Sequence, residues 1–251
     1  MAWGNFITIP CPCKLWDSKL KNLMLAMYPT IGAVIGTGWM LSLFVILKIP
    51  APVSDNLIAF VLLIYIFLIC GGMHLDGFMD VSDAVMSRRS IEERQRILKD
   101  STVGAFAVMS NVFLMLGWFA MLSEVSAIKA NLYVVLFIIP ITSRACSGAW
   151  VLLYKPLEIS QYKDDFKENN RLICFIIILI EAGIYIGATL TVQYLIFTRL
   201  FILPVVIAQI LVSFIACLYA RKQLGGMNGD IAGYSLCISE IVGIVATSLV
   251  A

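Results

Sequence analysis

The sequence is poor in charge, in histidine and in paired cysteine. Charged residues make up 14% of the 251 residues and apolar residues 61%, whereas a soluble domain has about 25% charged residues. That balance excludes an ordinary soluble domain. His74 is the single histidine, which excludes a histidine-rich metal site. Seven scattered cysteines, an odd number, form no disulfide framework. The first 22 residues lack the apolar core of a signal peptide, so we expect the first span to direct insertion.

Long apolar runs dominate the rest of the chain. Hydrocarbon cannot hydrogen-bond a bare backbone, so apolar runs of about 20 residues are expected to be spanning helices. The sequence therefore predicts an all-α polytopic membrane helix bundle, with residues 1–251 as one integral membrane domain. Gly32, Gly36 and Gly38 predict close helix packing in the first span. The seven predicted spans are 23–47, 57–73, 103–122, 131–153, 172–196, 200–219 and 231–251.

The positive charges lie on one side of this topology. The predicted inside segments hold 14 lysines and arginines and the outside loops hold 3, which places the N-terminus in the cytoplasm and the C-terminus outside. We therefore expect a multi-pass protein of the inner, cytoplasmic membrane, in contact with the lipid bilayer. The net charge is only +2; no nucleic-acid partner is expected, and the oligomeric state stays open. The inside segments are 1–22, 74–102, 154–171 and 220–230.

The cytoplasmic segment 74–102 differs in kind from the other loops. It is long and carries charges of both signs. Within it, Ser90 and Glu93 have the spacing of a capping box, which predicts a short helix along the membrane surface. The outside loops are short and carry no candidate functional motif, so the functional site is expected to face the cytoplasm.

Three aspartates at the start of this segment carry the strongest chemical signal. Asp76, Asp80 and Asp83 have i, i+4, i+7 spacing, which places them on one helix face. Three stacked carboxylates near lipid repel each other unless a divalent cation neutralises them. Oxygen ligands favour Mg²⁺ or Mn²⁺ bound together with substrate phosphates. The alternative is a solvated acidic face just past a membrane exit.

A second motif precedes the third predicted span. Asp100 or Ser101 is expected to cap the N-terminus of that span. A helix N-terminus beside Lys99, with Gly104 close by, also suits a phosphate, and Asp100 could add a metal ligand. Both interpretations stay open on the sequence alone.

A third motif opens the last span. Gly225, Gly226 and Gly229 would let backbone N–H groups approach an anion at the start of a helix. The alternative is a glycine-rich turn with Asn228 or Asp230 as the helix cap. All three motifs fall on the cytoplasmic side of the predicted topology.

Ionisable residues inside spans are expensive and often functional. Arg144 is predicted to pair with Glu240 or Glu181, or else to bind a phosphate. His74 lies two residues before Asp76, which makes it a candidate for the site as well as for a structural role.

Together these segments resemble the cobalamin synthase family, adenosylcobinamide-GDP ribazoletransferase. The resemblance covers essentially the whole chain, and the stretch 71–84 is its specific part. Thr8 stands where many members carry an arginine, and Cys237 where some carry a second glutamate. The matching positions are Pro10, Pro12, Pro29, Gly32, Gly36, Gly71, Gly72, His74, Asp76, Gly77, Asp80, Asp83, Ala84, Lys99, Asp100, Gly104, Arg144, Gly225, Gly226, Gly229, Asp230 and Glu240.

The resemblance implies a transferase that completes the nucleotide loop of cobalamin. A hydroxyl of α-ribazole, or of its 5′-phosphate, would attack the phosphorus that bears the cobinamide arm of adenosylcobinamide-GDP, and GMP would leave. The cofactor implied is Mg²⁺, held by Asp76, Asp80 and Asp83 together with Asp230 and Glu240. Phosphate would be held by Lys99, Ser101, Gly104, Arg144, Gly225, Gly226, Asn228 and Gly229, and the base would come from the aspartates, with His74 and Asp100 as further catalytic candidates.

Two other functions compete with this interpretation. A CDP-alcohol phosphotransferase also places aspartates on helices at a membrane surface, but no second aspartate pair follows Asp80 at that family's spacing. A secondary transporter would use Arg144, Glu181 and Glu240 as its pathway.

Overall fold

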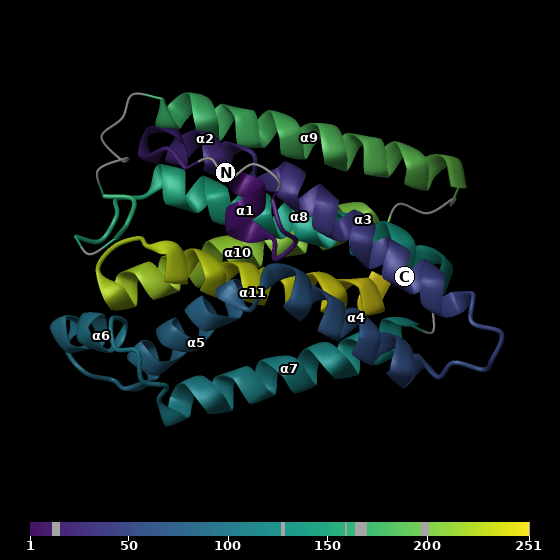
Figure 1. Cartoon of the computed structure of the whole chain (residues 1–251), viewed down its shortest axis with the longest axis horizontal. Helices are drawn as coiled ribbons and strands as arrows, with labels where there is room; N and C mark the ends of the chain where they lie inside the picture. Colours follow the sequence, from purple (N-terminus) through teal and green to yellow (C-terminus); the bar gives the residue numbers. More distant parts are fainter. Residues whose placement is uncertain (12–15, 127–128, 159, 164–169, 197–200, 251) are drawn as a thin grey trace.

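The computed structural model is a bundle of helices, as the sequence predicts (Figure 1). In the part of the chain that it describes, the only β-type pairing is one isolated bridge between Pro156 and Met227. The described ranges are 1–11, 16–126, 129–158, 160–163, 170–196 and 201–250.

Six of the described helices are long and apolar enough to cross a membrane. They correspond to six of the seven predicted spans. Their bounds are α3 (Tyr28–Leu47), α7 (Ala105–Ser126), α8 (Lys129–Leu153), α9 (Arg171–Ile196), α10 (Ile202–Leu224) and α11 (Gly229–Val250). The shorter helices are α1 (Ala2–Phe6), η1 (Ser18–Leu20), α2 (Lys21–Ala26), α4 (Asp55–Cys70), α5 (Met73–Met86) and α6 (Ile91–Ile97).

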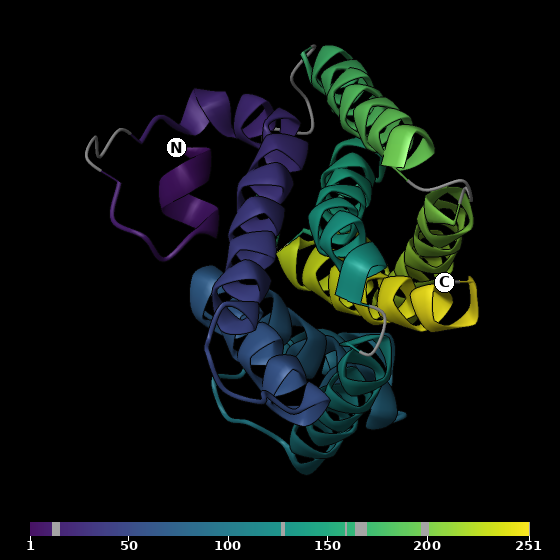
Figure 2. The same ribbon diagram turned by 90° about the vertical axis from the view of Figure 1, so that its right-hand side faces the viewer.

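Helix α8 runs through the interior of the bundle, with α3, α9, α10 and α11 packed around it (Figure 2). The tight contact with α3 depends on glycine. A Cβ atom on Gly32 or Gly36 would lie 2.5 Å from the backbone oxygen of Pro140 or Phe137 respectively. Gly38 packs in the same way against the Tyr65 ring of α4. The predicted role of these three glycines in close helix packing is therefore confirmed.

The predicted span 57–73 is wrong at its end, because the helix stops at Cys70. The pair α4 and α5 is bent by 91° and makes a seventh crossing only if both helices are counted as one broken span. Gly71 and Gly72 form the bend with φ of +61° and +75°, the left-handed region that favours glycine. Helix α4 has 16 residues, about 24 Å at 1.5 Å per residue, which is short of the ~30 Å hydrocarbon core.

The N-terminal segment satisfies the backbone oxygens that this bend releases. The Thr8 hydroxyl donates to the Leu68 carbonyl at 2.8 Å, and the Thr8 N–H donates to the Ile69 carbonyl at 2.9 Å. A helix end has no intrahelical partners for its last carbonyls, and inside a membrane no bulk water replaces them. Thr8 therefore supplies hydrogen-bond donors to the last carbonyls of α4.

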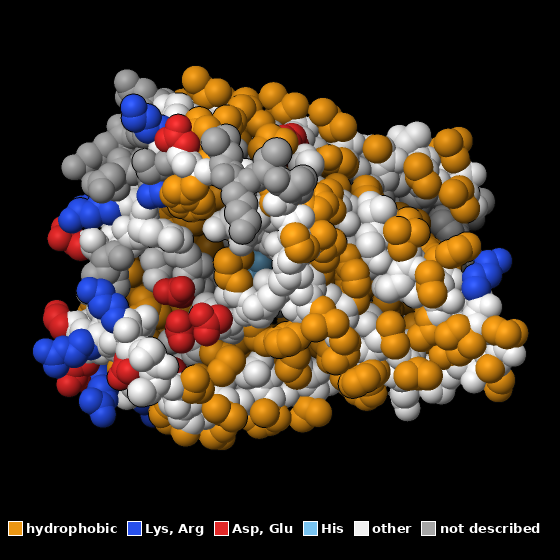
Figure 3. All heavy atoms as spheres, in the orientation of Figure 1, with side chains coloured by type: hydrophobic (Ala, Val, Ile, Leu, Met, Phe, Trp, Pro, Cys, Tyr) orange, Lys and Arg blue, Asp and Glu red, His pale blue; other side chains and the backbone are white. Residues whose placement is uncertain are grey.

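Charge is concentrated at one end of the molecule (Figure 3). Lysine, arginine and carboxylate side chains gather at the end where α5 and α6 lie in Figure 1, while apolar side chains cover the rest of this face. This distribution is the one expected of a membrane protein whose polar end meets water.

Helix α6 is docked onto the end of α10. Its cap is the predicted one, since the Ser90 hydroxyl oxygen accepts from the Glu93 N–H at 3.4 Å. Arg94 donates to the Gln223 carbonyl at 3.2 Å and Gln95 to the Leu224 carbonyl at 2.8 Å. These are terminal carbonyls of α10, so α6 both caps that helix and forms part of the polar end.

Candidate active site

The acidic residues of α5 share one face, as their spacing predicts. Asp76, Asp80 and Asp83 all line one cavity of about 20 Å³. Asp76 is exposed, and the other two are half-buried. A volume of this size has room for about one water-sized particle. The cavity also touches Gly104 and Ala107, where α7 begins.

Asp230 adds a fourth carboxylate from α11. Burial most strongly opposes a negative charge on Asp80, and the charges on Asp76, Asp230 and Asp83 add to this effect. The approach of α11 depends on Gly77, where a Cβ would lie 2.9 Å from the Cα of Asp230. Gly233 plays the same part in α11, with a Cβ position 2.9 Å from the carbonyl oxygen of His74. These two glycines bring the carboxylates of α5 and α11 together.

The donor chemistry of this group fits a hard divalent cation. All four side chains offer carboxylate oxygens, which suit Mg²⁺ or Mn²⁺. The cavity has space for a particle of that size, and a cation would relieve the repulsion around Asp80. Across the described ranges, no three His, Cys, Asp or Glu side chains converge closely enough to form a ligand cluster. A bound cation would have to draw these carboxylates together.

Asp83 also caps α7. Its Oδ1 accepts from the backbone N–H of Ala107, the third residue of that helix, at 3.3 Å. Gly104 lies so close to the carboxylate that a Cβ there would overlap both of its oxygens. The expectation that Asp100 or Ser101 caps this span is wrong, because α7 begins at Ala105 and its cap comes from α5.

Lys99, Asp100 and Ser101 are exposed. Asp100 Oδ1 accepts from the Thr102 N–H at 3.0 Å, and this hydrogen bond holds the pKa of the Asp100 carboxyl below its usual value. Asp100 therefore fixes the turn before α7. From this segment, the carboxylate cavity is lined by Thr102, Val103 and Gly104, whereas Lys99 and Asp100 line a neighbouring cavity.

The glycine-rich turn before α11 uses its backbone groups in hydrogen bonds to the segment after α8. The Met227 N–H donates to the Lys155 carbonyl at 3.0 Å, and the Leu157 N–H donates to the Met227 carbonyl at 2.8 Å. A Cβ on Gly226 would lie 3.0 Å from the Leu157 backbone nitrogen. Gly225, with φ of +87°, ends α10. Backbone packing thus accounts for these glycines.

Asn228 is the cap of α11, one of the two interpretations that the sequence left open. Its Oδ1 accepts from the Ile231 N–H at 3.0 Å, and its Nδ2 donates to Asp230 at 2.6 Å. Asn228 therefore orients the carboxylate of Asp230. Gly229, the first residue of α11, lies beside Gln161.

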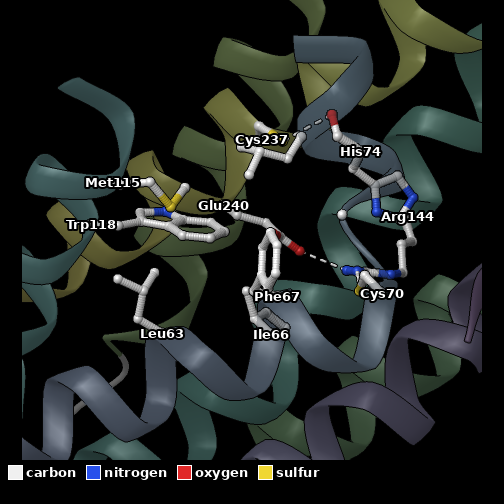
Figure 4. Close-up of a pocket in the computed structure, with 12 residues that line it drawn as sticks. Leu63, Ile66, Phe67, Cys70, His74, Met115, Trp118, Arg144, Cys237 and Glu240 are labelled. Atoms are coloured by element: carbon white, nitrogen blue, oxygen red, sulfur yellow. Dashed lines mark hydrogen bonds and ion pairs between the residues drawn. The ribbon is translucent and has the colours of Figure 1, made fainter. Parts of the chain in front are cut away.

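Arg144 and Glu240 form a buried ion pair, with an N–O distance of 2.6 Å (Figure 4). Arg144 is fully buried and Glu240 is 2% exposed. Ser143 donates to Glu240 at 3.0 Å, and Arg144 also contacts the Cys70 sulfur at 3.2 Å, next to the bend between α4 and α5. The predicted pairing of Arg144 with Glu240 is confirmed.

This pair corrects two predictions about the site. Glu240 was expected among the metal ligands, and Arg144 among the phosphate-binding residues. The structure commits each of them to the other inside the bundle, and neither lines the carboxylate cavity. Glu181 has a different partner, because it accepts from the Thr30 hydroxyl at 2.9 Å.

His74 is also inside the bundle, in the first turn of α5. It is 8% exposed, and its Nε2 lies 2.5 Å from the Tyr28 hydroxyl. Its backbone carbonyl accepts from the Cys237 thiol at 3.4 Å. His74 does not line the carboxylate cavity; it lines a separate cavity of about 30 Å³ inside the bundle, together with Arg144 and Glu240 (Figure 4). A role of His74 in the reaction stays a prediction.

Comparison with known proteins identifies the family. The family model described as Cobalamin-5-phosphate synthase matches residues 1–248. The chain belongs to the cobalamin-5-phosphate synthase family. An adenosylcobinamide-GDP ribazoletransferase of Clostridium perfringens (strain 13 / Type A) is 40% identical over 100% of this chain and 96% of the relative. One of Clostridium botulinum (strain Alaska E43 / Type E3) is 34% identical over 99% of this chain and 96% of the relative. No solved structure matches the chain.

Sequence reasoning missed two contacts in this member of the family. Thr8 was noted only as a departure from a family pattern, and Tyr28 was not considered. Their partners, at Leu68, Ile69 and His74, are more than 40 positions away in the chain. No local pattern signals such a contact. The Gly71–Gly72 pair could have signalled the bend.

We expect Gly104→Ala to damage the site of this family member. The added methyl would displace the Asp83 carboxylate from the start of α7. Loss of this helix cap costs about 1 kcal/mol of stability. Turnover would also fall, because Asp83 no longer faces the cavity. Thermal unfolding and turnover check this. Gly183→Ala is the control: nothing lies within 4 Å of its Cβ position, so helix propensity should leave stability equal or higher. Equal behaviour of the two variants would contradict the assignment.

Proposed function

We propose that this chain joins adenosylcobinamide-GDP to α-ribazole, or to α-ribazole 5′-phosphate. The products would be adenosylcobalamin, or its 5′-phosphate, and GMP. Full-length similarity to proteins named adenosylcobinamide-GDP ribazoletransferase supports the substrates. The single structural observation that carries the proposal is the row of three α5 carboxylates that line one small cavity at the charged end of the bundle, with Asp230 of α11 packed against the same helix at Gly77.

The proposed reaction is a displacement at phosphorus. The ribazole hydroxyl oxygen forms a bond to the phosphorus that bears the cobinamide arm, the bond from that phosphorus to the GMP oxygen breaks, and GMP leaves with the bonding electrons. A carboxylate accepts the hydroxyl proton. Asp76 and Asp80 are better placed for this than Asp83, because Asp83 already accepts a hydrogen bond from the start of α7.

Mg²⁺ is the cofactor we propose. When bound it would neutralise charge on the transferring phosphoryl group, which is the main requirement of phosphoryl transfer. Asp76 and Asp80 would hold it, with Asp230 from α11, oriented by Asn228. Asp83 would position the segment around Gly104 against the cation.

We also propose that the protein lies in the cytoplasmic membrane with its charged end in the cytosol. The excess of lysine and arginine on one side of the topology supports this orientation. Exposed Glu92 of α6 and Ala51, between α3 and α4, serve as probes. Cysteines placed at 92 and 51, with Cys11 and Cys13 replaced by serine, should react with an impermeant thiol reagent from opposite sides of sealed cells. Labelling of position 92 from outside would invert the orientation.

The function is tested with purified protein and both substrates. We expect GMP and the joined corrinoid to appear in equal amounts by mass spectrometry, and to be lost when a chelator is added. No GMP release under any condition would remove the proposal. The transporter alternative is not favoured, because Arg144 is paired with Glu240 while Glu181 contacts Thr30 on a different helix.

A further inference from the structure

The carboxylate cavity has no cation of its own to receive an anionic substrate. The residues that line it are acidic, apolar or small, apart from Thr102. A diphosphate that approaches the three carboxylates of this cavity meets repulsion beyond what one divalent ion removes. Positive side chains close to the cavity are therefore required.

Several cations near the polar end already have partners. Arg144 is buried against Glu240, and Arg94 is used by Gln223 at the end of α10. Lys21 donates to the Gln161 carbonyl at 3.2 Å, and the Arg221 guanidinium lies 3.6 Å from the centre of the Tyr154 ring. The glycine turn before α11 also offers little, since its Met227 N–H is bonded to Lys155.

One open cavity beside the carboxylates does carry cations. Its volume is about 300 Å³, far larger than that of the carboxylate cavity, and Arg89, Arg96 and Lys99 line it. It adjoins the carboxylate cavity, because Ile97 lines both. Figure 3 shows lysine and arginine side chains next to carboxylates at this end of the molecule. The two cavities therefore meet at Ile97, and Asp80 lines the smaller of them.

The acidic residues of this cavity leave two of its cations unpaired. Glu93 pairs with Arg89 at 3.8 Å, and Asp100 accepts a hydrogen bond from the Thr102 N–H. Arg96 and Lys99 are exposed and, within the described part of the chain, form no ion pair. A guanidinium and an ammonium provide several donors for phosphate oxygens.

We infer that Arg96 and Lys99 form the binding site for the nucleotide phosphates of the substrate. The ligand class is a nucleoside diphosphate, whose reacting phosphorus extends past Ile97 into the carboxylate cavity while the nucleotide lies over α6. This inference deepens the proposed function and rests on it for the identity of the substrate. It assigns phosphate binding to Arg96, which no sequence motif indicated. It also places Lys99 beside Arg96 in the same phosphate site.

The test compares Arg96→Gln and Lys99→Gln with Lys222→Gln, an exposed cation near the end of α10 that does not line the cavity. The protein is placed in vesicles of neutral phosphatidylcholine. We expect each of the first two variants to raise the KM for adenosylcobinamide-GDP about tenfold, with the KM for α-ribazole unchanged. Equilibrium dialysis should show that GDP itself binds about tenfold more weakly. The control should match the parent chain.

The outcomes separate this inference from the proposed function. If no product forms but GDP binding depends on Arg96 and Lys99, the proposed phosphate site is supported and the proposed transfer reaction is refuted. If product forms and neither variant changes the KM or the GDP affinity, the inference is overturned. Anionic lipid headgroups share the phosphate chemistry. If the variants lose only a stimulation by added phosphatidylglycerol, the cavity serves lipid and not the nucleotide.

Discussion

Asp80→Asn is expected to lower turnover about 1,000-fold while the protein still folds. Asp80 lines the carboxylate cavity together with Asp76 and Asp83, and the negative charges of these two residues and of Asp230 act against its own. The amide keeps the shape of the side chain but loses the negative charge that a cation or a proton would need. Loss of a general base or of electrostatic stabilisation typically costs 10²–10⁴-fold. Turnover is measured as GMP release at saturating substrates.

The stability of the same variant separates a chemical effect from a folding effect. Asp80 is half-buried and repelled by its neighbours, so removing its charge should leave the unfolding temperature equal or higher. Asp17→Asn, the same substitution at an exposed site, should keep full turnover. Full turnover of Asp80→Asn would remove Asp80 from the mechanism.

Arg144→Met is expected to destabilise the folded protein by about 3–5 kcal/mol, because it leaves Glu240 buried without a partner. Glu240 is 2% exposed, and the neutral Ser143 hydroxyl that donates to it at 3.0 Å does not balance its charge. Arg144 also contacts Cys70, the last residue of α4. Its loss should therefore loosen the bend from which α5 starts. Reversible unfolding in mixed micelles measures the cost.

A double-variant cycle isolates the pair from the surrounding packing. Arg144→Met combined with Glu240→Leu should be less destabilised than the sum of the two single variants, since no buried charge is left. Arg89→Met is the control, because the Arg89–Glu93 pair is exposed and should contribute less than about 1 kcal/mol. Additive costs for Arg144 and Glu240 would show that the buried contact contributes little.

The sequence predicted most of the fold because the hydrocarbon requirement acts locally. A run of about 20 apolar residues is visible without knowledge of its neighbours, and Gly32 and Gly36 are visible in the same way. The break after Cys70 was not predicted, although the sequence has two glycines, Gly71 and Gly72, directly after it. A Gly–Gly pair allows a helix to end but does not say that Thr8 will satisfy the freed carbonyls.

The acidic site was predicted where it depends on spacing within one helix and less well where it depends on packing between helices. Asp76, Asp80 and Asp83 share a face because they belong to α5. The position of Glu240 could not be predicted from spacing, because only tertiary contacts decide that its carboxylate meets Arg144. Asp83 as the cap of α7 likewise depends on how α5 and α7 meet.

The central claim is that the carboxylates of α5 and α11 bind a divalent cation that takes part in phosphoryl transfer. Mn²⁺ titration followed by electron paramagnetic resonance tests it most directly, because free and bound Mn²⁺ give distinct signals. With adenosylcobinamide-GDP present, the parent chain should bind Mn²⁺ and Asp80→Asn should leave it free, while Asp17→Asn binds as the parent does. Equal Mn²⁺ binding by the parent chain and Asp80→Asn would contradict the claim.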